Sequence, residues 1–152
     1  MHIETLKNVL HWTKEFHQHL SQCLANGADK NTDERARMIL DYLADHEQRL
    51  TKVINGFKIS GDDPILNTWC YEYLNKQPIV QCVHCDTPFS ELNAVQIMDV
   101  IVEQHQQVIE LYRYLAARAV IPSVQEMMNS LKSLEEHEMK RMVQSANSLA
   151  DI

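Results

Sequence analysis

Apolar residues recur along the chain every three or four positions, which is the spacing of one face of an α-helix. The clearest run alternates steps of four and three and consists of Ile39, Leu43, His46, Leu50, Val53 and Phe57. Similar stripes indicate three more helices, so we expect long helices over about residues 2–25, 34–55, 88–120 and 123–149. Only 3 Gly and 4 Pro occur in the 152 residues, too few for a fold of many short strands and tight turns.

Residues that favour helix ends fall between these stripes. Asn26-Gly27 predicts the end of the first helix, and the run from Asn31 to Glu34 predicts the start of the second. Thr87-Pro88, a capping residue followed by proline, predicts the start of the third helix. Ile121-Pro122 interrupts the third stripe, and Ser123 to Glu126 forms a capping-box pattern that opens the fourth helix.

The lengths of the connections predict the topology. Short links join the first helix to the second and the third to the fourth, which favours two antiparallel hairpins. Residues 59–86 are numerous enough to cross the bundle between the hairpins, and Pro64–Asn75 is expected to form a short helix there. We therefore predict an all-α four-helix bundle in which residues 1–152 form one domain.

Charge and hydropathy exclude some classes of binding partner and predict where the protein is located. The 14 Lys and Arg are scattered among 21 Asp and Glu, and the formal net charge is −7, which argues against nucleic acid or an anionic membrane as partner. No apolar run approaches the roughly 20 residues that span a bilayer, and no secretory leader is recognisable. We therefore expect a cytoplasmic protein whose four cysteines are reduced.

Eight histidines are the one compositional excess. His46 and His105 fall at the centres of their apolar stripes, and Glu138 falls near the centre of its own with Glu135 beside it. His17 and Glu47 fall at stripe edges. A buried carboxylate needs a hydrogen-bonding partner or a metal ion, so these residues predict either a buried polar network or a site for Fe, Mn or Zn.

The two hairpins also resemble each other in sequence. Glu-x-His-Gln occurs around His17 in the first helix and again around His105 in the third, 88 positions later. Leu-Ala-Asp-His-Glu around His46 is similar to Leu-Glu-Glu-His-Glu around His137, 91 positions later. These offsets suggest one helical hairpin that was doubled, with a change of 3 residues in its loop.

Together these features resemble the ferritin-like superfamily, in particular its rubrerythrin-type members. The resemblance rests on the doubled hairpin, the long crossover, and the segments Leu-Ala-Asp-His-Glu-Gln-Arg-Leu at 43–50 and Leu-Glu-Glu-His-Glu-Met-Lys-Arg at 134–141. That family holds two metal ions with a Glu on the first and third helices and a Glu-x-x-His on the second and fourth. Here Glu47 and Glu138 correspond to the second-helix and fourth-helix glutamates, whereas Leu50 and Arg141 stand where the family has histidine.

The first and third helices depart from the family as well, since their inward residues are His17 and His105 rather than glutamate. The resemblance implies a non-haem iron or manganese protein of oxidoreductase or metal-handling type that forms a homodimer. Its metal ligands and their neighbours would be His17, His46, Glu47, His105 and Glu138, with an open position for dioxygen or peroxide. The alternative is a metal-free bundle that acts as an interaction or dimerisation module, in which the same residues form a buried network that fixes helix register.

Cys82 and Cys85 form a CxxC pair within the expected crossover. A zinc site would need two more ligands, and only Cys70 and His84 are near in sequence. A redox-active dithiol is a second interpretation, because a helix start at Thr87-Pro88 would lower the pKa of a nearby thiol. Two ordinary loop cysteines are the third.

Overall fold

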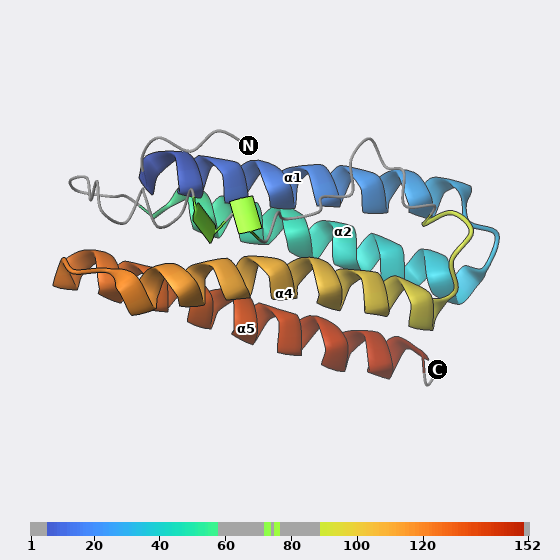
Figure 1. Cartoon of the computed structure of the whole chain (residues 1–152). Helices are drawn as coiled ribbons and strands as arrows, with labels where there is room; N and C mark the ends of the chain where they lie inside the picture. Colours follow the sequence, from blue (N-terminus) through green and yellow to red (C-terminus); the bar gives the residue numbers. More distant parts are fainter. Residues whose placement is uncertain (1–5, 58–71, 74, 77–88, 151–152) are drawn as a thin grey trace.

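Four long helices make up most of the structure (Figure 1). The computed structural model describes residues 6–57, 72–73, 75–76 and 89–150. The helices are α1 (Leu6–Lys30), α2 (Glu34–Asn55), α4 (Ala94–Arg118) and α5 (Pro122–Ala150). Residues 72–73 and 75–76 are also helical, and the described part of the chain contains no strand. The predicted all-α class and the four-helix bundle are therefore confirmed.

Each pair of helices that follow one another closely in sequence forms a hairpin. Three residues, 31–33, join α1 to α2, and three residues, 119–121, join α4 to α5. The helices of each hairpin pack against each other along their length. Between the hairpins, α2 contacts both α5 and α4, and His17 of α1 also reaches Glu135 of α5. The crossover expected over 59–86, with its short helix over 64–75, lies almost entirely outside the described residues.

Asn31 ties the first hairpin loop to the start of the second hairpin. Its side-chain oxygen accepts a hydrogen bond from the backbone N–H of Asp33 at 2.9 Å, and its amide donates to the carbonyls of Phe89 at 2.9 Å and Leu92 at 3.0 Å. Asp33 then caps α2 by accepting from the N–H of Arg35 at 3.0 Å. The predicted start of the second helix is confirmed, and Asn31 is buried because its polar groups are satisfied.

The predicted end of the first helix at Asn26-Gly27 is wrong, because α1 continues to Lys30. Gly27 lies inside the helix, where Phe89 packs directly against its backbone. A Cβ atom built on Gly27 would lie only 2.5 Å from the Cβ of Phe89. Glycine is therefore required here by the close approach of a buried aromatic residue rather than by a helix end.

Replacing Gly27 with alanine should destabilise the protein by about 1–2 kcal/mol, because overpacking against Phe89 outweighs the gain in helix propensity. Chemical denaturation followed by circular dichroism measures this change in the free energy of unfolding. Gly56→Ala is the matched control, since its nearest neighbour would be a backbone oxygen 3.2 Å away and its backbone is already helical. Equal effects of the two substitutions would contradict the packing explanation.

The second hairpin also begins differently from the prediction. The described α4 starts at Ala94, and residues 89–91 form a turn before it, so the helix does not run on continuously from Thr87-Pro88. Asn93 and Gln96 form the capping box: the Asn93 side chain accepts from the N–H of Gln96 at 2.9 Å, and the Gln96 side chain accepts from the N–H of Asn93 at 3.0 Å. Thr87 and Pro88 themselves lie outside the described residues.

The last helix starts one residue before the capping pattern that predicts it. Pro122 is its first residue, a position where the missing N–H of proline leaves no helical hydrogen bond unmade. The carbonyl of Ile121 accepts from the N–H of Gln125 at 3.0 Å and so begins the helical ladder.

The two hairpins are equivalent at a single offset along the chain. Leu6 and Ala94 begin α1 and α4, Lys30 and Arg118 end them, and Glu34 and Pro122 begin α2 and α5, and each pair is 88 positions apart. Buried core residues follow the same offset, as in Val9 and Ile97, Leu43 and Leu131, and Ile54 and Met142. The second predicted offset of 91 and the change in loop length are therefore wrong, because both loops have the same length.

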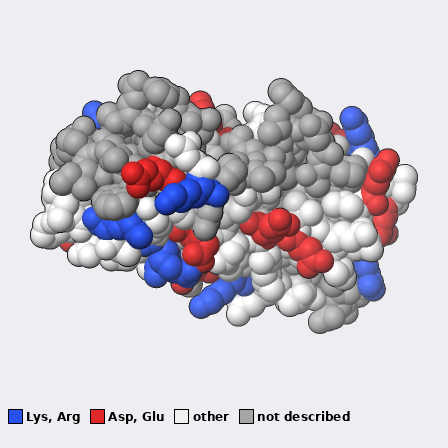
Figure 2. Space-filling view, in the orientation of Figure 1, with Lys and Arg blue, Asp and Glu red and all other residues white. Residues whose placement is uncertain are grey.

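Charged side chains of both signs are scattered over the surface that Figure 2 shows. On the face shown in Figure 2, Lys and Arg side chains lie among Asp and Glu side chains. Among the helices described, none combines the length and the apolar content needed to cross a membrane.

Candidate metal centre

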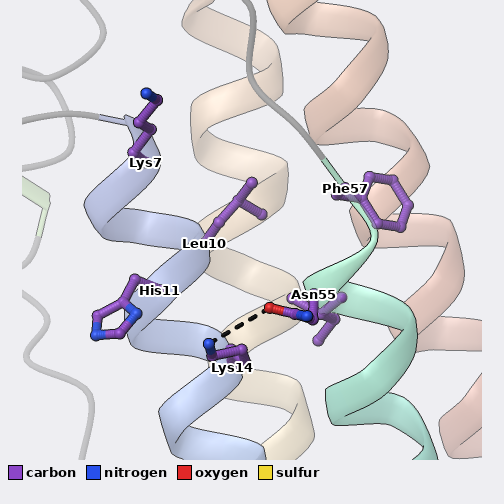
Figure 3. Close-up of a pocket in the computed structure, with 7 residues that line it drawn as sticks. Lys7, Leu10, His11, Lys14, Asn55 and Phe57 are labelled. Carbon is purple, nitrogen blue, oxygen red and sulfur yellow. Dashed lines mark hydrogen bonds between the residues drawn. The ribbon is translucent and has the colours of Figure 1, made fainter.

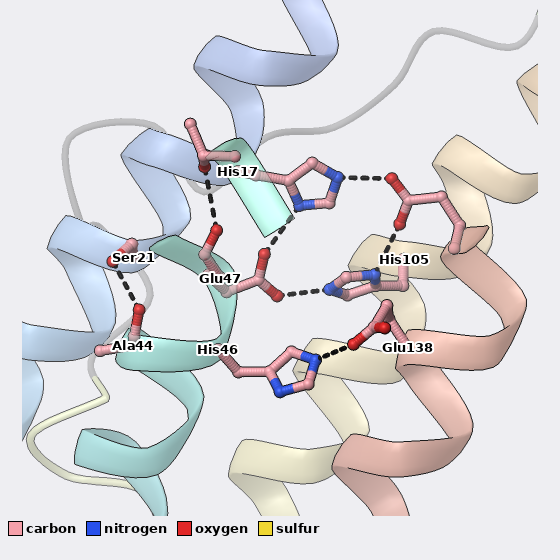
Figure 4. A network of polar contacts seen from close by, with 9 residues as sticks. His17, Ser21, Ala44, His46, Glu47, His105 and Glu138 are labelled. Atoms are coloured by element: carbon pink, nitrogen blue, oxygen red, sulfur yellow. Dashed lines mark hydrogen bonds and ion pairs between the residues drawn. The ribbon is translucent and has the colours of Figure 1, made fainter. Parts of the chain in front are cut away.

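One side chain from each of the four helices points into the centre of the bundle, where histidines contact glutamates (Figure 4). His17 comes from α1, Glu47 from α2, His105 from α4 and Glu135 from α5. The four side chains are 0% exposed. We call these four residues the His–Glu square, because histidines and glutamates alternate around it.

Every ring nitrogen of the square contacts a carboxylate oxygen. His17 Nδ1 lies 2.7 Å from Glu47 Oε2, and His17 Nε2 lies 2.6 Å from Glu135 Oε1. His105 Nδ1 lies 3.0 Å from Glu135 Oε2, and His105 Nε2 contacts Glu47 Oε1. Each glutamate thus receives one nitrogen on each of its two oxygens, and no ring nitrogen or carboxylate oxygen of the square is left unpaired.

These contacts follow the internal repeat. Each histidine uses Nδ1 toward the Oε2 atom of the glutamate in its own hairpin, and Nε2 toward the Oε1 atom of the glutamate in the other hairpin. His17 and His105 are 88 positions apart, and so are Glu47 and Glu135. The square therefore has two-fold symmetry in its contacts, and two of its four contacts join one hairpin to the other.

The charges of the square support one another. Burial on its own would lower the pKa of both imidazoles, but the adjacent charges and hydrogen bonds of Glu47 and Glu135 outweigh burial and raise it. Burial likewise opposes ionisation of the two carboxyls, and the two imidazolium groups outweigh it and lower the pKa of both. At neutral pH and without a metal ion, these shifts favour the imidazolium form of both histidines and the carboxylate form of both glutamates.

Further side chains pack closely around the square. The ring of Phe16 meets the ring of His17 edge-on, with centroids 5.3 Å apart, and the rings of His17 and His105 lie 5.1 Å apart. Tyr112 is also fully buried, and its pKa is raised by that burial and by the charge of Glu135. Thr13 is buried as well and donates to the carbonyl of Leu10 at 3.1 Å.

His46 and Glu138, which the sequence places in the site, form a separate pair beside the square (Figure 4). His46 Nε2 lies 2.5 Å from Glu138 Oε2, and the two side chains are 7% and 16% exposed. The other carboxylate oxygen of Glu138 lies 3.5 Å from Nη1 of Arg141. Both residues adjoin the square along their helices. His46 directly precedes Glu47 in the chain, and Glu138 lies one helical turn beyond Glu135.

Glu135, rather than Glu138, is the carboxylate that α5 directs into the bundle centre. The inward stripe of this helix consists of Met128, Leu131, Glu135 and Met142, all 0% exposed. Glu138 lies about 60° around the helix from Glu135, because residues three apart are separated by about 300°. The 88-position offset from Glu47 is the sequence signal that singles out Glu135.

The donor set fits a metal ion. One atom each from His17, His105 and Glu135 can be chosen so that all three lie within 4.8 Å of one another. Glu47, which contacts both histidines, is a fourth donor residue and the second carboxylate of the square. Imidazole nitrogen with carboxylate oxygen is a combination that Fe, Mn and Zn accept, and binding would require the histidines to release their protons.

Of the four cysteines, the structure describes only Cys23. Cys82 and Cys85 lie outside the described residues, as does Cys70. Cys23 is buried in α1, where its sulfur lies 3.6 Å from Nε2 of His19. Cys23 is disulfide-bonded, which departs from the expectation of four reduced thiols.

A surface pocket lies apart from the square, between the start of α1 and the end of α2 (Figure 3). It has a volume of about 360 Å³ and is lined by Lys7, Leu10, His11, Lys14, Ile54, Asn55 and Phe57. Lys14 Nζ donates to Asn55 Oδ1 at 3.4 Å across it. None of the square residues lines this pocket, so it offers no access to the bundle centre.

Comparison with known proteins finds no significant match to a family model, to a curated protein or to a solved structure. The function of the chain must therefore be argued from the His–Glu square itself.

Proposed function

We propose that this protein binds iron or manganese in the interior of a ferritin-like four-helix bundle and acts as an oxidoreductase or a metal-handling protein. The observation that carries the proposal is the His–Glu square: two imidazoles and two carboxylates, one from each helix, fully buried. Isolated polar groups are costly in a protein core, so four that converge at one point favour a specific use. The ligands would be His17, Glu47, His105 and Glu135.

Each residue of the square has a definite role in this proposal. The two carboxylates supply negative charge that offsets a divalent cation, and their positions between the histidines let each reach both halves of the site. Each histidine offers one nitrogen as a ligand and keeps the other on a carboxylate, which orients the ring. Bound iron or manganese would supply one-electron redox chemistry toward dioxygen or peroxide.

Metal titration tests the proposal. Metal-free wild-type protein mixed anaerobically with Mn(II) or Fe(II) should take up at least about one ion per chain, because the four ligands are held in place by packed helices. Uptake should release protons, since His17 and His105 carry them beforehand. Isothermal titration in two buffers of different ionisation enthalpy measures both the stoichiometry and the proton release.

The variant Glu47→Gln/Glu135→Gln should lose this uptake, because its amides carry no charge to balance the ion. The matched control is Glu136→Gln, which neutralises the neighbouring, partly exposed carboxylate and should leave uptake unchanged. If the wild-type protein takes up no metal, or if the double variant takes up as much as the wild type, the proposal is wrong.

A metal-free structural network is the second candidate. One observation favours it: the ring nitrogens and carboxylate oxygens of the square already satisfy one another. In this reading the square fixes the register of the two hairpins in an interaction or dimerisation module. It predicts no metal uptake in the same titration, and the two candidates therefore give opposite results.

Other sequence-based expectations stay predictions. They are the homodimer, the cytoplasmic location, and a redox or zinc role for Cys82 and Cys85.

A further inference from the structure

The internal repeat makes it possible to ask where the two halves of the site differ. His46 on α2 corresponds, at the offset of 88, to Leu134 on α5, and Glu138 on α5 corresponds to Leu50 on α2. The pair formed by His46 and Glu138 is thus polar, whereas the equivalent positions on the other side of the square are two leucines. Arg141 next to Glu138 corresponds in the same way to Val53. One side of the square is polar and the other is apolar.

Exposure rises steadily along the polar side. We call His46, Glu138 and Arg141 the polar lane. Its side chains are 7%, 16% and 59% exposed, in that order, while the square next to it is 0% exposed. His46 Nε2 lies 2.5 Å from Glu138, and Glu138 lies 3.5 Å from Arg141, so the polar lane runs from beside the buried square to the protein surface. Its inner end adjoins the square along the chain, because His46 precedes Glu47 and Glu138 lies one helical turn from Glu135. On the other side, Leu50 is buried and Leu134 packs against the core.

We propose that the polar lane is the route by which a divalent cation reaches the square, with His46 and Glu138 as transient ligands and Arg141 as a latch over the outer end. The inference rests on the proposed metal-binding function and adds a path to it. A cation that crosses an apolar layer loses its hydration with nothing in return, so a path lined by imidazole and carboxylate is strongly preferred. Among the described residues that the repeat makes equivalent, His46 and Glu138 provide such a lining on one side of the square, and Leu50 and Leu134 stand on the other.

Arg141 has the opposite effect to the other two residues. Its guanidinium lies against Glu138 and brings a positive charge to the outer end of the polar lane. That charge repels an incoming cation and occupies one of the two carboxylate oxygens it would use. Removal of Arg141 should therefore speed uptake, although removal of His46 and Glu138 should slow it.

The experiment measures the rate of uptake in full-length, metal-free protein. Stopped-flow mixing with Mn(II) and a chelating dye gives the rate, and equilibrium dialysis gives the final stoichiometry. The variant His46→Leu/Glu138→Leu copies the leucines of the other side and should load about tenfold more slowly or worse while reaching the wild-type stoichiometry. Arg141→Val copies Val53 and should load faster than the wild type.

Two further measurements keep the test decisive. Circular dichroism establishes that each variant is folded, and Glu138→Gln, which keeps the shape of the side chain, should also slow uptake if the leucine variant fails to fold. An unchanged rate in a folded Glu138→Gln or His46→Leu/Glu138→Leu protein would overturn the route, as would slower loading of Arg141→Val. A lower final stoichiometry in the leucine variant would overturn it too, because the pair would then be permanent ligands. Absence of uptake by the wild type would instead refute the metal-binding function itself.

Discussion

Replacing Glu135 with alanine should lower the free energy of unfolding of the metal-free protein by about 3–5 kcal/mol, which is the range for one partner lost from a buried ion pair. Glu135 contacts both His17 and His105 and is 0% exposed. Its removal leaves two imidazolium groups with a single carboxylate between them in a site without water contact. The same substitution also leaves a cavity in the bundle centre, which adds to the loss.

Urea denaturation followed by circular dichroism measures the effect. Glu136→Ala is the matched control, because its partly exposed side chain makes only surface ion pairs, and it should change stability by less than about 1 kcal/mol. A second variant tests the charge argument itself. In His17→Leu/Glu135→Leu one cation leaves with one anion, so its loss of stability should be smaller than the sum of the two single losses. Additive losses would contradict the charge pairing.

The second large effect is a loss of stability at alkaline pH in the metal-free protein. Burial opposes the charged form of each histidine, but the two glutamates outweigh burial and raise the pKa of His17 to about 9 and that of His105 to about 10, from an ordinary 6.5. A group whose pKa is raised by folding stabilises the fold fully below its unfolded value and loses that contribution as the pH rises through the folded value. The loss is about 3 kcal/mol for His17 and about 4 kcal/mol for His105, so the free energy of unfolding should fall by roughly 7 kcal/mol between pH 6.5 and 10.

At acid pH the glutamates, rather than the histidines, are the groups whose titration lowers stability. Folding lowers the pKa of Glu47 and Glu135 from an ordinary 4.5, since the imidazolium charges outweigh the effect of burial. A group of this kind stabilises the fold above its unfolded pKa and loses that contribution as the pH falls toward the folded value. Stability from the square should thus be greatest between about pH 4.5 and 6.5.

Denaturation curves at about pH 3, 5.5, 7.5 and 10 sample the acid limb, the plateau and the alkaline limb of this prediction. The variant in which His17, Glu47, His105 and Glu135 are all leucine is the reference, because it retains the other titratable groups near the site, including His46, Glu138 and Tyr112. Its stability should change much less between pH 6.5 and 10 than that of the wild type. If both proteins lose the same stability over this range, the square is not the source of the pH dependence.

The helices and their hairpins were accessible from sequence because each depends on local pattern. The stripe that contains Ile39, Leu43 and Leu50 predicts a buried face, and these residues are buried in α2. The wrong predictions of helix ends arise where a contact between residues distant in sequence determines the local structure. Asn26-Gly27 is typical of a helix end, yet Phe89 packs on Gly27 in mid-helix, and no local pattern contains information about that contact.

The sequence predicted part of the site, because local pattern also shows which polar residues lie near the apolar face of a helix. His17, Glu47 and His105 are recognisable as polar residues on or next to apolar stripes, and the structure brings these three together. Glu135 and Glu138 are one turn apart on α5, and the phase of its apolar stripe does not separate them at the precision of a helical wheel. The 88-position offset from Glu47 does separate them, and in the folded bundle Glu135 is the carboxylate that meets His17 and His105.

Anomalous X-ray scattering from crystals of the Mn(II)-loaded protein tests the central claim most directly, because it locates the ion. The account predicts an anomalous peak within about 2.5 Å of donor atoms of His17, His105, Glu47 and Glu135, the distance range of metal–ligand bonds. Crystals of Glu47→Gln/Glu135→Gln prepared in the same way should lack the peak. A fully loaded crystal with no peak in the square, or with its peaks only elsewhere, would contradict the claim that these four residues form a metal site.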